Sequence, residues 1–525
     1  MEFSKVTYRP VDESYFEARR LERQGGQWSL LCLGVGTVIV GEFSGWSPGL
    51  LLGGLGGLLV ATLLITVMYV AFCMSQAELA TMMPFAGAGY AYARAGLGPA
   101  WGAFTAYTQI ICYIVLSAVV CIDVTHYLGP VVGVVLGGIT IPEPVMWLVI
   151  FAVFVAINVH GARLTFIIVI ATTIAAVVVL VGFLVSLRGG FSLVNALEIA
   201  RDVDGSGWLP NGFSGIAWSI PFAIWFYVGI EALPLAAEES ERPRRHMPRA
   251  LVGGIAIIIV LALATLFLNS GASAGANAVG LSPEPLLHAV KVSLSGLGMP
   301  ILLKFLATSG GIASFHAIIY VYGRAIYAAS RAAYVPPWLS VTDPVRRTPR
   351  RALVVGGIVG YLITLAIDLS PDGVLLDEIL INMATFAALT SCAVQMVAYL
   401  VLARDYPSLP RPYRSAAGPT GAMTALLTAV VALVLMFFNP TLRPGLYGLA
   451  TALLVGMAYF FAYARHRLVE TPEEAYAVRA IAHIDDGRGE SETPRELSSD
   501  QSGGGRPATA ATFPAPLPPD GGGGG

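Results

Sequence analysis

The sequence predicts an all-α protein that crosses a membrane many times, and three observations lead to this fold class. The chain of 525 residues is 56% hydrophobic and only 12% charged, whereas a soluble domain carries roughly 25% charged residues. Its charge-free runs are long enough to cross a bilayer as helices, which takes about 20 residues each. Basic residues are concentrated in alternate loops between these runs, as expected for a multi-pass membrane protein.

The charge-free runs predict twelve transmembrane helices once the longest run, over residues 43–77, is divided in two. That run is too long for one crossing, and its segment SPGLLLGG at 47–54 carries the proline and glycine signals of a turn. The predicted spans cover residues 29–46, 52–76, 101–128, 143–158, 164–186, 214–236, 250–270, 299–330, 353–369, 378–403, 420–437 and 444–463.

The loop charges predict the orientation of these spans. If the N-terminus lies inside, the inner loops carry 14 arginines and the outer loops only 4 basic residues. Short cytoplasmic loops are rich in lysine and arginine, so both termini are expected in the cytoplasm, with the spans in the cytoplasmic (inner) membrane. An even number of spans agrees with this orientation.

The composition divides the chain into three parts. Residues 1–28 form a polar cytoplasmic segment, which does not resemble a cleavable signal peptide. Residues 29–463 form the twelve-helix domain. Residues 464–525 are rich in proline, glycine and serine and end in five glycines, so we expect a disordered cytoplasmic tail.

Spans one and six both carry signals of a broken helix. The segment GVGTVIVGEFSGW at 34–46 contains four glycines, and span six contains Gly215, Pro221, Gly229 and Pro234. Interrupted helices at matching positions of two halves indicate the binding site of a transporter. We therefore expect a first repeat over about 29–186, a second over about 214–403, and two extra helices over about 420–463. The alternative is that these glycines and prolines only serve helix packing.

Two carboxylates, Glu42 and Glu231, accompany these breaks near the middle of the membrane. A charge in hydrocarbon is costly, so we expect both to have a function. Six further ionisable residues lie in the spans, namely Glu78, Asp123, His126, Lys304, His316 and Arg324. For Glu78, Asp123, Lys304 and Arg324, which are near span ends, local pairing or snorkelling to the surface is the simpler interpretation.

The chemistry of a broken helix follows from its backbone. The first half ends in free carbonyls, which suit a substrate ammonium group, and the second half begins with free amides, which suit a carboxylate. An aromatic face next to the break can also attract an organic cation. Span six offers such residues, namely Phe222, Trp225, Phe226 and Tyr227, although an aromatic stripe is more often plain packing.

Other classes of protein are not indicated by the sequence. Cys32, Cys73, Cys112, Cys121 and Cys392 show no CxxC or Cys/His spacing, so neither a disulfide framework nor a metal site is expected. No nucleophile constellation points to an enzyme. We expect no cofactor and no nucleic-acid partner.

Four segments, taken together and in this order, resemble the amino acid–polyamine–organocation superfamily of transporters. They are GVGTVIVGEF, MSQAELATMMPFAGAGYAYARAGLGP, PFAIWFYVGIEALPLAAEESERPRRHMPRAL and SGGIASFHAIIYVYGRAIYAASRAAYVPPWLS, followed by TPRRAL at 348–353. The resemblance covers about residues 25–465. It implies the leucine-transporter fold, with two inverted five-helix repeats and the substrate at the breaks of spans one and six.

Within this superfamily the sequence is most similar to bacterial ethanolamine permeases. The resemblance implies that Gly34, Val35, Gly36 and Thr37 form the unwound stretch of span one. It also implies that Trp225 is a gate over the substrate and that Glu231 is an acid linked to gating or proton movement. The substrate site is expected to include Gly34, Val35, Gly36, Thr37, Gly41, Glu42, Gln109, Phe222, Trp225, Glu231, Ser314 and His316.

The chain departs from the superfamily pattern at two points. Amino acid carriers usually read GSGIF where this chain reads VGEF, so Glu42 would repel a substrate carboxylate there. The lysine of many proton-coupled members is replaced by Ala176. We therefore expect a carrier for a small amine, ethanolamine first, and keep a neutral amino acid permease as the alternative. The coupling ion, for which a proton stays open, the choice between symport and antiport, and the oligomeric state are not predicted.

Overall fold

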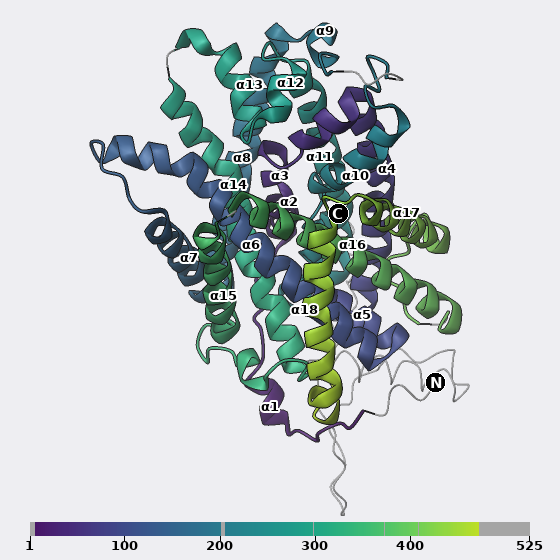
Figure 1. Cartoon of the computed structure of the whole chain (residues 1–525). Helices are drawn as coiled ribbons and strands as arrows, with labels where there is room; N and C mark the ends of the chain where they lie inside the picture. The colour runs from purple at the N-terminus through teal and green to yellow at the C-terminus, as the bar shows by residue number, and fades with distance from the viewer. Residues whose placement is uncertain (1–5, 201–204, 298, 372, 408, 472–525) are drawn as a thin grey trace, which may run out of the picture.

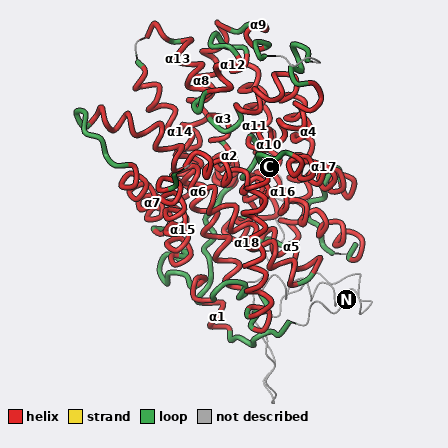
Figure 2. Tube along the Cα trace, in the orientation of Figure 1, coloured by secondary structure: helices red, strands yellow, loops and turns green. Residues whose placement is uncertain are grey.

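The protein folds into a bundle of helices that run mostly along one direction (Figure 1). The computed structural model describes residues 6–200, 205–297, 299–371, 373–407 and 409–471. Figure 2 shows helices joined by loops throughout this part of the chain. Most of the predicted C-terminal tail, from residue 472 onward, lies outside the described residues.

Two sets of helices follow one another along the chain. The first set is α2 (Gln27–Val38), α3 (Val40–Phe43), α4 (Ser47–Met82), α5 (Ala88–Leu97), α6 (Pro99–Val135), α7 (Glu143–Val159) and α8 (Ala162–Leu187). The second set is α10 (Gly212–Trp225), the 3₁₀ helix η3 (Ile230–Glu239), α11 (Pro243–Ser270), α14 (Pro300–Arg331), α15 (Arg350–Leu369) and α16 (Gly373–Asp405). Two further helices are α17 (Gly418–Phe438) and α18 (Arg443–Ala462).

Shorter elements connect these helices at the two ends of the bundle. They are α1 (Glu13–Glu17), η2 (Arg188–Gly190), α9 (Leu193–Ala196), α12 (Ala276–Leu281), α13 (Pro285–Ser293), η4 (Ser295–Leu297), η5 (Pro337–Ser340) and η6 (Ala464–His466). In Figure 1, α9, α12 and α13 lie at the upper end, and α1 lies at the lower end.

The twelve predicted spans all correspond to apolar helices. In the described part of the chain, ten helices are long and apolar enough to cross a membrane, and the shorter apolar segments Gln27–Phe43 and Glu143–Val159 supply the other two. The protein is thus an all-α, multi-pass membrane protein with two five-helix repeats and two extra helices.

The start of span two is different from the prediction. Helix α4 begins at Ser47, and the predicted turn appears inside it as a kink at Gly54, where φ is 65°. A side chain at Gly54 would meet the ring of Pro210 as well as adopt a strained backbone. The SPGLLLGG segment therefore bends a helix instead of forming a separate loop.

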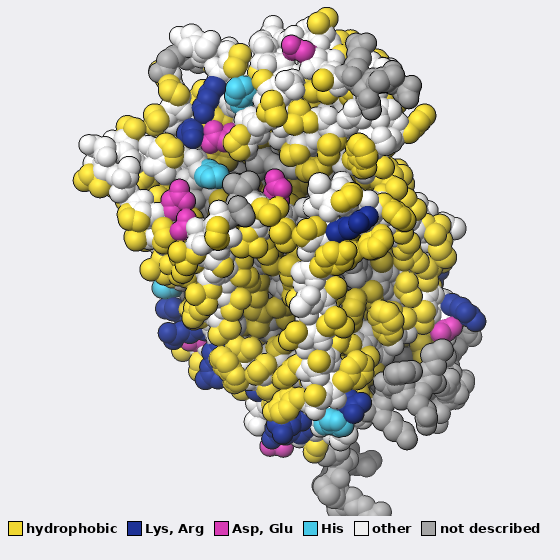
Figure 3. Space-filling view, in the orientation of Figure 1, with side chains coloured by type: hydrophobic (Ala, Val, Ile, Leu, Met, Phe, Trp, Pro, Cys, Tyr) yellow, Lys and Arg dark blue, Asp and Glu magenta, His cyan; other side chains and the backbone are white. Residues whose placement is uncertain are grey.

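The surface of the bundle is divided into zones. Figure 3 shows hydrophobic side chains over the middle of the molecule, whereas Lys and Arg gather mainly toward the lower end, where α1 lies. Such a band is the surface expected to face lipid. The interior is built around α14, which packs against α2, α6 and α8, while α10 packs against α4.

The N-terminal segment lies across this lower end and forms hydrogen bonds with several of its helices. Arg19 donates from Nε to the Ser340 hydroxyl over 2.9 Å, and the Tyr327 hydroxyl donates to the Arg19 carbonyl. The amides of Gln24 and Gly25 donate to the carbonyl of Glu239. We call this end of the molecule the N-terminal face.

Candidate functional site

The first break lies a few residues later than predicted. Helix α2 continues to Val38, and α3 starts at Val40 after the single residue Ile39. The prediction that residues 34–37 are unwound is therefore wrong, because these four residues are buried within α2.

The glycines of α2 serve close packing. A Cβ atom at Gly36 would collide with the hydroxyl of Thr173 on α8, and one at Gly34 would press on the Leu233 side chain. The Thr173 hydroxyl itself donates to the carbonyl of Cys32 over 3.0 Å. Glycine here allows neighbouring segments to approach α2 closely, which is a packing role that small residues often have in membrane helices.

Ser314 of α14 joins the two sides of this break. Its hydroxyl donates to the Gly36 carbonyl over 2.7 Å and accepts from the Val40 amide over 2.9 Å. The side chain is completely buried. One hydroxyl therefore satisfies a carbonyl of the first half-helix and an amide of the second, as the polar ends of a broken helix require.

The second break lies where it was predicted. Helix α10 ends at Trp225, and η3 begins at Ile230. Gly229 between them has φ of 115°, and a Cβ atom there would crowd Thr37 of α2. Only glycine enters this conformation readily, so the second break lies against the last turn of α2 at Thr37.

Trp225 lies against the second half of the first broken span. A Cβ atom at Gly41 would meet the Trp225 carbonyl, and one at Gly45, where φ is 87°, would overlap its indole ring. The side chain is 3% exposed. Its indole nitrogen has no hydrogen-bond partner among the residues that the structure describes. A donor is thus available beside the first break.

Glu42 is buried on the same short helix. Its side chain is 1% exposed. Neither carboxylate oxygen has a hydrogen-bond partner within the described part of the chain. The Thr265 hydroxyl of α11 faces the carboxylate, outside the geometry of a hydrogen bond. An unpaired buried carboxylate is unfavourable unless it has a partner during function.

Glu231 lies on the other side of the second break. One carboxylate oxygen accepts from the Gly229 amide over 2.8 Å, so the side chain caps the start of η3. The Glu231 carbonyl accepts from Gln76 over 2.8 Å, and Gln76 also donates to Gln395 over 3.2 Å. Glu231 therefore connects the break to polar side chains of α4 and α16.

Three other predicted site residues do not meet the first break. His316 lies between Asn158 and the Thr165 carbonyl, at 3.3 and 3.2 Å, because it projects from another side of α14 than Ser314. Phe222 faces Gly49 of α4. Gln109 is buried next to Gly89 and Gln395, toward the Glu231 side of the structure.

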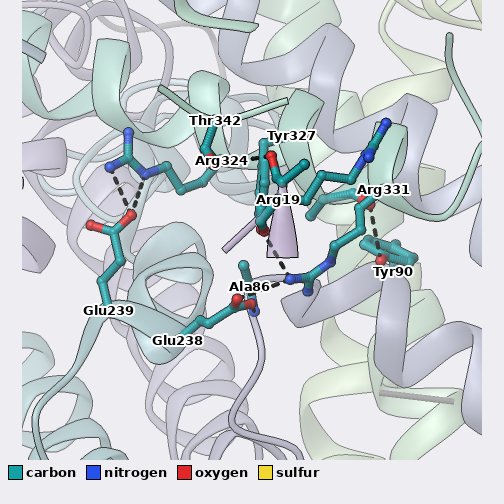
Figure 4. A network of polar contacts seen from close by, with 11 residues as sticks. Arg19, Ala86, Tyr90, Glu238, Glu239, Arg324, Tyr327, Arg331 and Thr342 are labelled. Atoms are coloured by element: carbon teal, nitrogen blue, oxygen red, sulfur yellow. Dashed lines mark hydrogen bonds and ion pairs between the residues drawn. The ribbon is translucent and has the colours of Figure 1, made fainter. Parts of the chain in front are cut away.

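The ionisable residues near the span ends are paired locally, as predicted. Glu78 and Arg411 are 2.5 Å apart, and Glu78 also accepts from the Tyr399 hydroxyl. Lys304 pairs with Glu284 at 3.0 Å. Asp123 accepts from the Ser44 hydroxyl over 3.2 Å. At the N-terminal face, Arg324 points to Glu239 and Arg331 points to Glu238 (Figure 4).

Several residues around the breaks were missed by the sequence analysis. Thr265 faces Glu42, and Asn269 lies one turn further along α11. Thr173 and Gln76 bind backbone carbonyls of the two broken spans. All are uncharged, so a search for ionisable residues within apolar spans does not find them. Isolated polar residues in those spans are the signal that was available.

The fold and the two adjoining breaks define a class of protein, the membrane transporters with two inverted repeats. A crystal structure of MhsT in complex with L-phenylalanine has the same fold, with a TM-score of 0.56 at 13% sequence identity. The match covers 79% of this chain and 99% of that chain. The family model for amino acid permeases matches residues 27–467, so the chain belongs to the amino acid permease family.

Individual relatives are named as transporters or permeases. An uncharacterized transporter of Rhizobium meliloti (strain 1021) is 33% identical over 338 residues, which are 64% of this chain and 71% of that protein. The branched-chain amino acid permease BcaP of Bacillus subtilis (strain 168) is 24% identical over 469 residues, 85% of this chain and 94% of that protein. The family and the fold are those of membrane transporters and not of enzymes.

Proposed function

We propose that this permease is a secondary active transporter that moves a small organic amine, ethanolamine first among them, across the cytoplasmic membrane by alternating access. The observation that carries the proposal is the burial of Glu42 in α3, directly after the first break, with both carboxylate oxygens lacking partners among the described residues. A substrate cation would supply the missing countercharge.

The charge of Glu42 argues against a substrate that carries its own carboxylate at this point. Two like charges repel strongly in a site from which water is excluded. The amide end of α3 would attract a carboxylate, but here its Val40 amide already donates to Ser314. An amine without a carboxylate avoids the repulsion, and its ammonium group can bind at Glu42 beside the break.

A neutral amino acid permease is the second candidate. The name of the Bacillus subtilis relative, a branched-chain amino acid permease, favours it. In that case Glu42 would have a structural role facing α11, and the substrate carboxylate would bind on another side of α3.

The remaining site roles and the orientation are part of the proposal. Trp225, packed over Gly41 and Gly45, is the gate, and Glu231, tied to Gly229, is the acid that responds to the state of the second break. The arginine-rich N-terminal face lies in the cytoplasm, so both termini are cytoplasmic. Residues 1–28 and 464–525 then flank a transporter domain over 29–463.

Uptake by purified protein in lipid vesicles tests the substrate. Labelled ethanolamine is expected to accumulate, and excess alanine or leucine is expected to leave its uptake unchanged. If alanine is transported and ethanolamine neither enters nor competes, the amine assignment is wrong and the amino acid permease is correct.

Glu42→Gln tests the observation that carries the proposal. The variant keeps the size of the side chain but removes its charge, so ethanolamine uptake is expected to lose affinity. Unchanged affinity would show that Glu42 does not take part in cation recognition.

A further inference from the structure

Three polar side chains of α3 and α11, two helices that pack against each other, are buried in the protein. They are Glu42 of α3, which is 1% exposed, and Thr265 and Asn269 of α11, which are both 0% exposed. Both Glu42 oxygens, the Thr265 hydroxyl and both amide atoms of Asn269 lack partners among the described residues. Such groups are rarely left unpaired in a folded protein, so their grouping points to a ligand.

The three side chains belong to two helices that contact each other. Helix α11 packs against α2 and α3, and the Thr265 hydroxyl faces the Glu42 carboxylate. Asn269 follows Thr265 by four residues on the same helix, and side chains four residues apart lie on the same helix face. α11 therefore presents a hydroxyl and an amide on the face that looks toward the buried carboxylate.

The chemistry of this set suits an ammonium group. The carboxylate, the hydroxyl and the amide oxygen are all acceptors, and a primary ammonium group offers three N–H donors to them. The positive charge would also favour the carboxylate form of Glu42, which burial alone disfavours. The Asn269 amide nitrogen is a donor, which can serve the hydroxyl of an amino alcohol.

We propose that Thr265 and Asn269 complete, with Glu42, a binding site for the ammonium group of the substrate, and that this site selects primary amines over N-methylated amines. The inference rests on the proposed amine transport and adds α11 to the residues that determine specificity. Each N-methyl group removes one donor and adds volume next to three buried side chains. Choline, which has no N–H donor, should therefore be rejected most strongly.

The test compares variants in vesicles with labelled ethanolamine, N-methylethanolamine and choline as probes. Thr265→Val and Asn269→Leu keep the approximate shape of the side chains but remove their hydrogen-bonding atoms. Each should raise the KM for ethanolamine about tenfold or more, as expected for a lost hydrogen bond to a charged group. The preference for ethanolamine over choline should decrease in the same variants.

Two further variants serve as controls. Thr265→Ser restores the hydroxyl and should recover the wild-type KM. Val260→Ala alters a side chain of the same helix that is 67% exposed, and it should leave both KM and selectivity unchanged. A single symmetric peak in gel filtration shows that each variant is folded.

The outcomes separate this inference from the function on which it rests. If wild-type protein carries ethanolamine but Thr265→Val and Asn269→Leu keep its KM and selectivity, the α11 site is wrong and amine transport stands. If ethanolamine uptake needs a sodium gradient and these variants change only the sodium dependence, the site holds a metal ion and the inference is overturned. If wild-type protein carries alanine and no amine, both proposals fail.

Discussion

Arg324 and Glu239 form an ion pair of 2.7 Å in which neither side chain is more than 1% exposed. The pair joins α14 to the end of η3, and the Tyr320 hydroxyl donates to the second Glu239 oxygen over 3.1 Å. The Glu239 carbonyl also accepts from the N-terminal segment. The second half of the second broken span is therefore attached to α14 and to the N-terminal segment at one point.

Removal of one member of this pair is expected to be strongly destabilising. Arg324→Met or Glu239→Met leaves an uncompensated buried charge, and such losses are about 3–5 kcal/mol. The double variant removes both charges and should be more stable than either single variant, because apolar side chains can replace a buried pair. Melting temperatures of the four proteins in detergent test this, and additive losses in the double variant would contradict it.

Ser314 is predicted to be important for the first break although it carries no charge. Ser314→Ala leaves the Gly36 carbonyl and the Val40 amide without the hydroxyl between them, and an unsatisfied buried group costs about 1–3 kcal/mol. We expect a lower melting temperature and slower uptake. Ser309→Ala is the matched control, because its hydroxyl, on the same helix, has no hydrogen-bond partner in the described part of the chain. Equal effects of the two variants would refute the bridging role.

The spans were predictable from the sequence, but the contacts at the breaks were not. Hydropathy reports the environment of each segment by itself, so all twelve spans were found. Glycine signals both a break and close packing, so the glycines of 34–46 did not fix the position of the break. The resemblance implied an unwound stretch at 34–37, whereas the helix ends only at Val38. Ser314 bonds to Gly36 and Val40, which lie far away in the sequence. A single sequence contains no record of which spans become neighbours.

Gly45 should tolerate no side chain, because two independent constraints apply to it. Its φ of 87° is strained for other residues by about 1–2 kcal/mol, and a Cβ atom would overlap the Trp225 indole. Gly45→Ala should therefore lower both stability and transport. Gly182→Ala in α8 is the control, since the added carbon would have no atom within 4 Å apart from its chain neighbours and the backbone of its own helix. In this variant, the free energy of unfolding should stay unchanged or rise by roughly 0.5–1 kcal/mol, because glycine weakens a helix interior relative to alanine.

The five cysteines provide a native reporter for opening at the N-terminal face. All are buried. Cys73 and Cys392 each lie three residues before Gln76 and Gln395, which bond to each other beside Glu231, and Cys112 donates to the Ala384 carbonyl of α16. Glu238 accepts from Arg331 over 2.9 Å and from the Ala86 amide over 3.1 Å, so it links η3 to two other segments at this face. We expect these bonds to break when the N-terminal face opens. Glu238→Ala should therefore favour the open state.

A maleimide reagent and mass spectrometry measure this opening in membrane vesicles. If the variant loses about 1.4 kcal/mol of closed-state stabilisation, the open population and the labelling rate at these three cysteines rise about tenfold. Cys121, on the same helix as Cys112 but nearer its far end, should stay unlabelled. Labelling of Cys121 at the same rate would indicate unfolding, and unchanged labelling of all five would show that Glu238 does not hold this face closed.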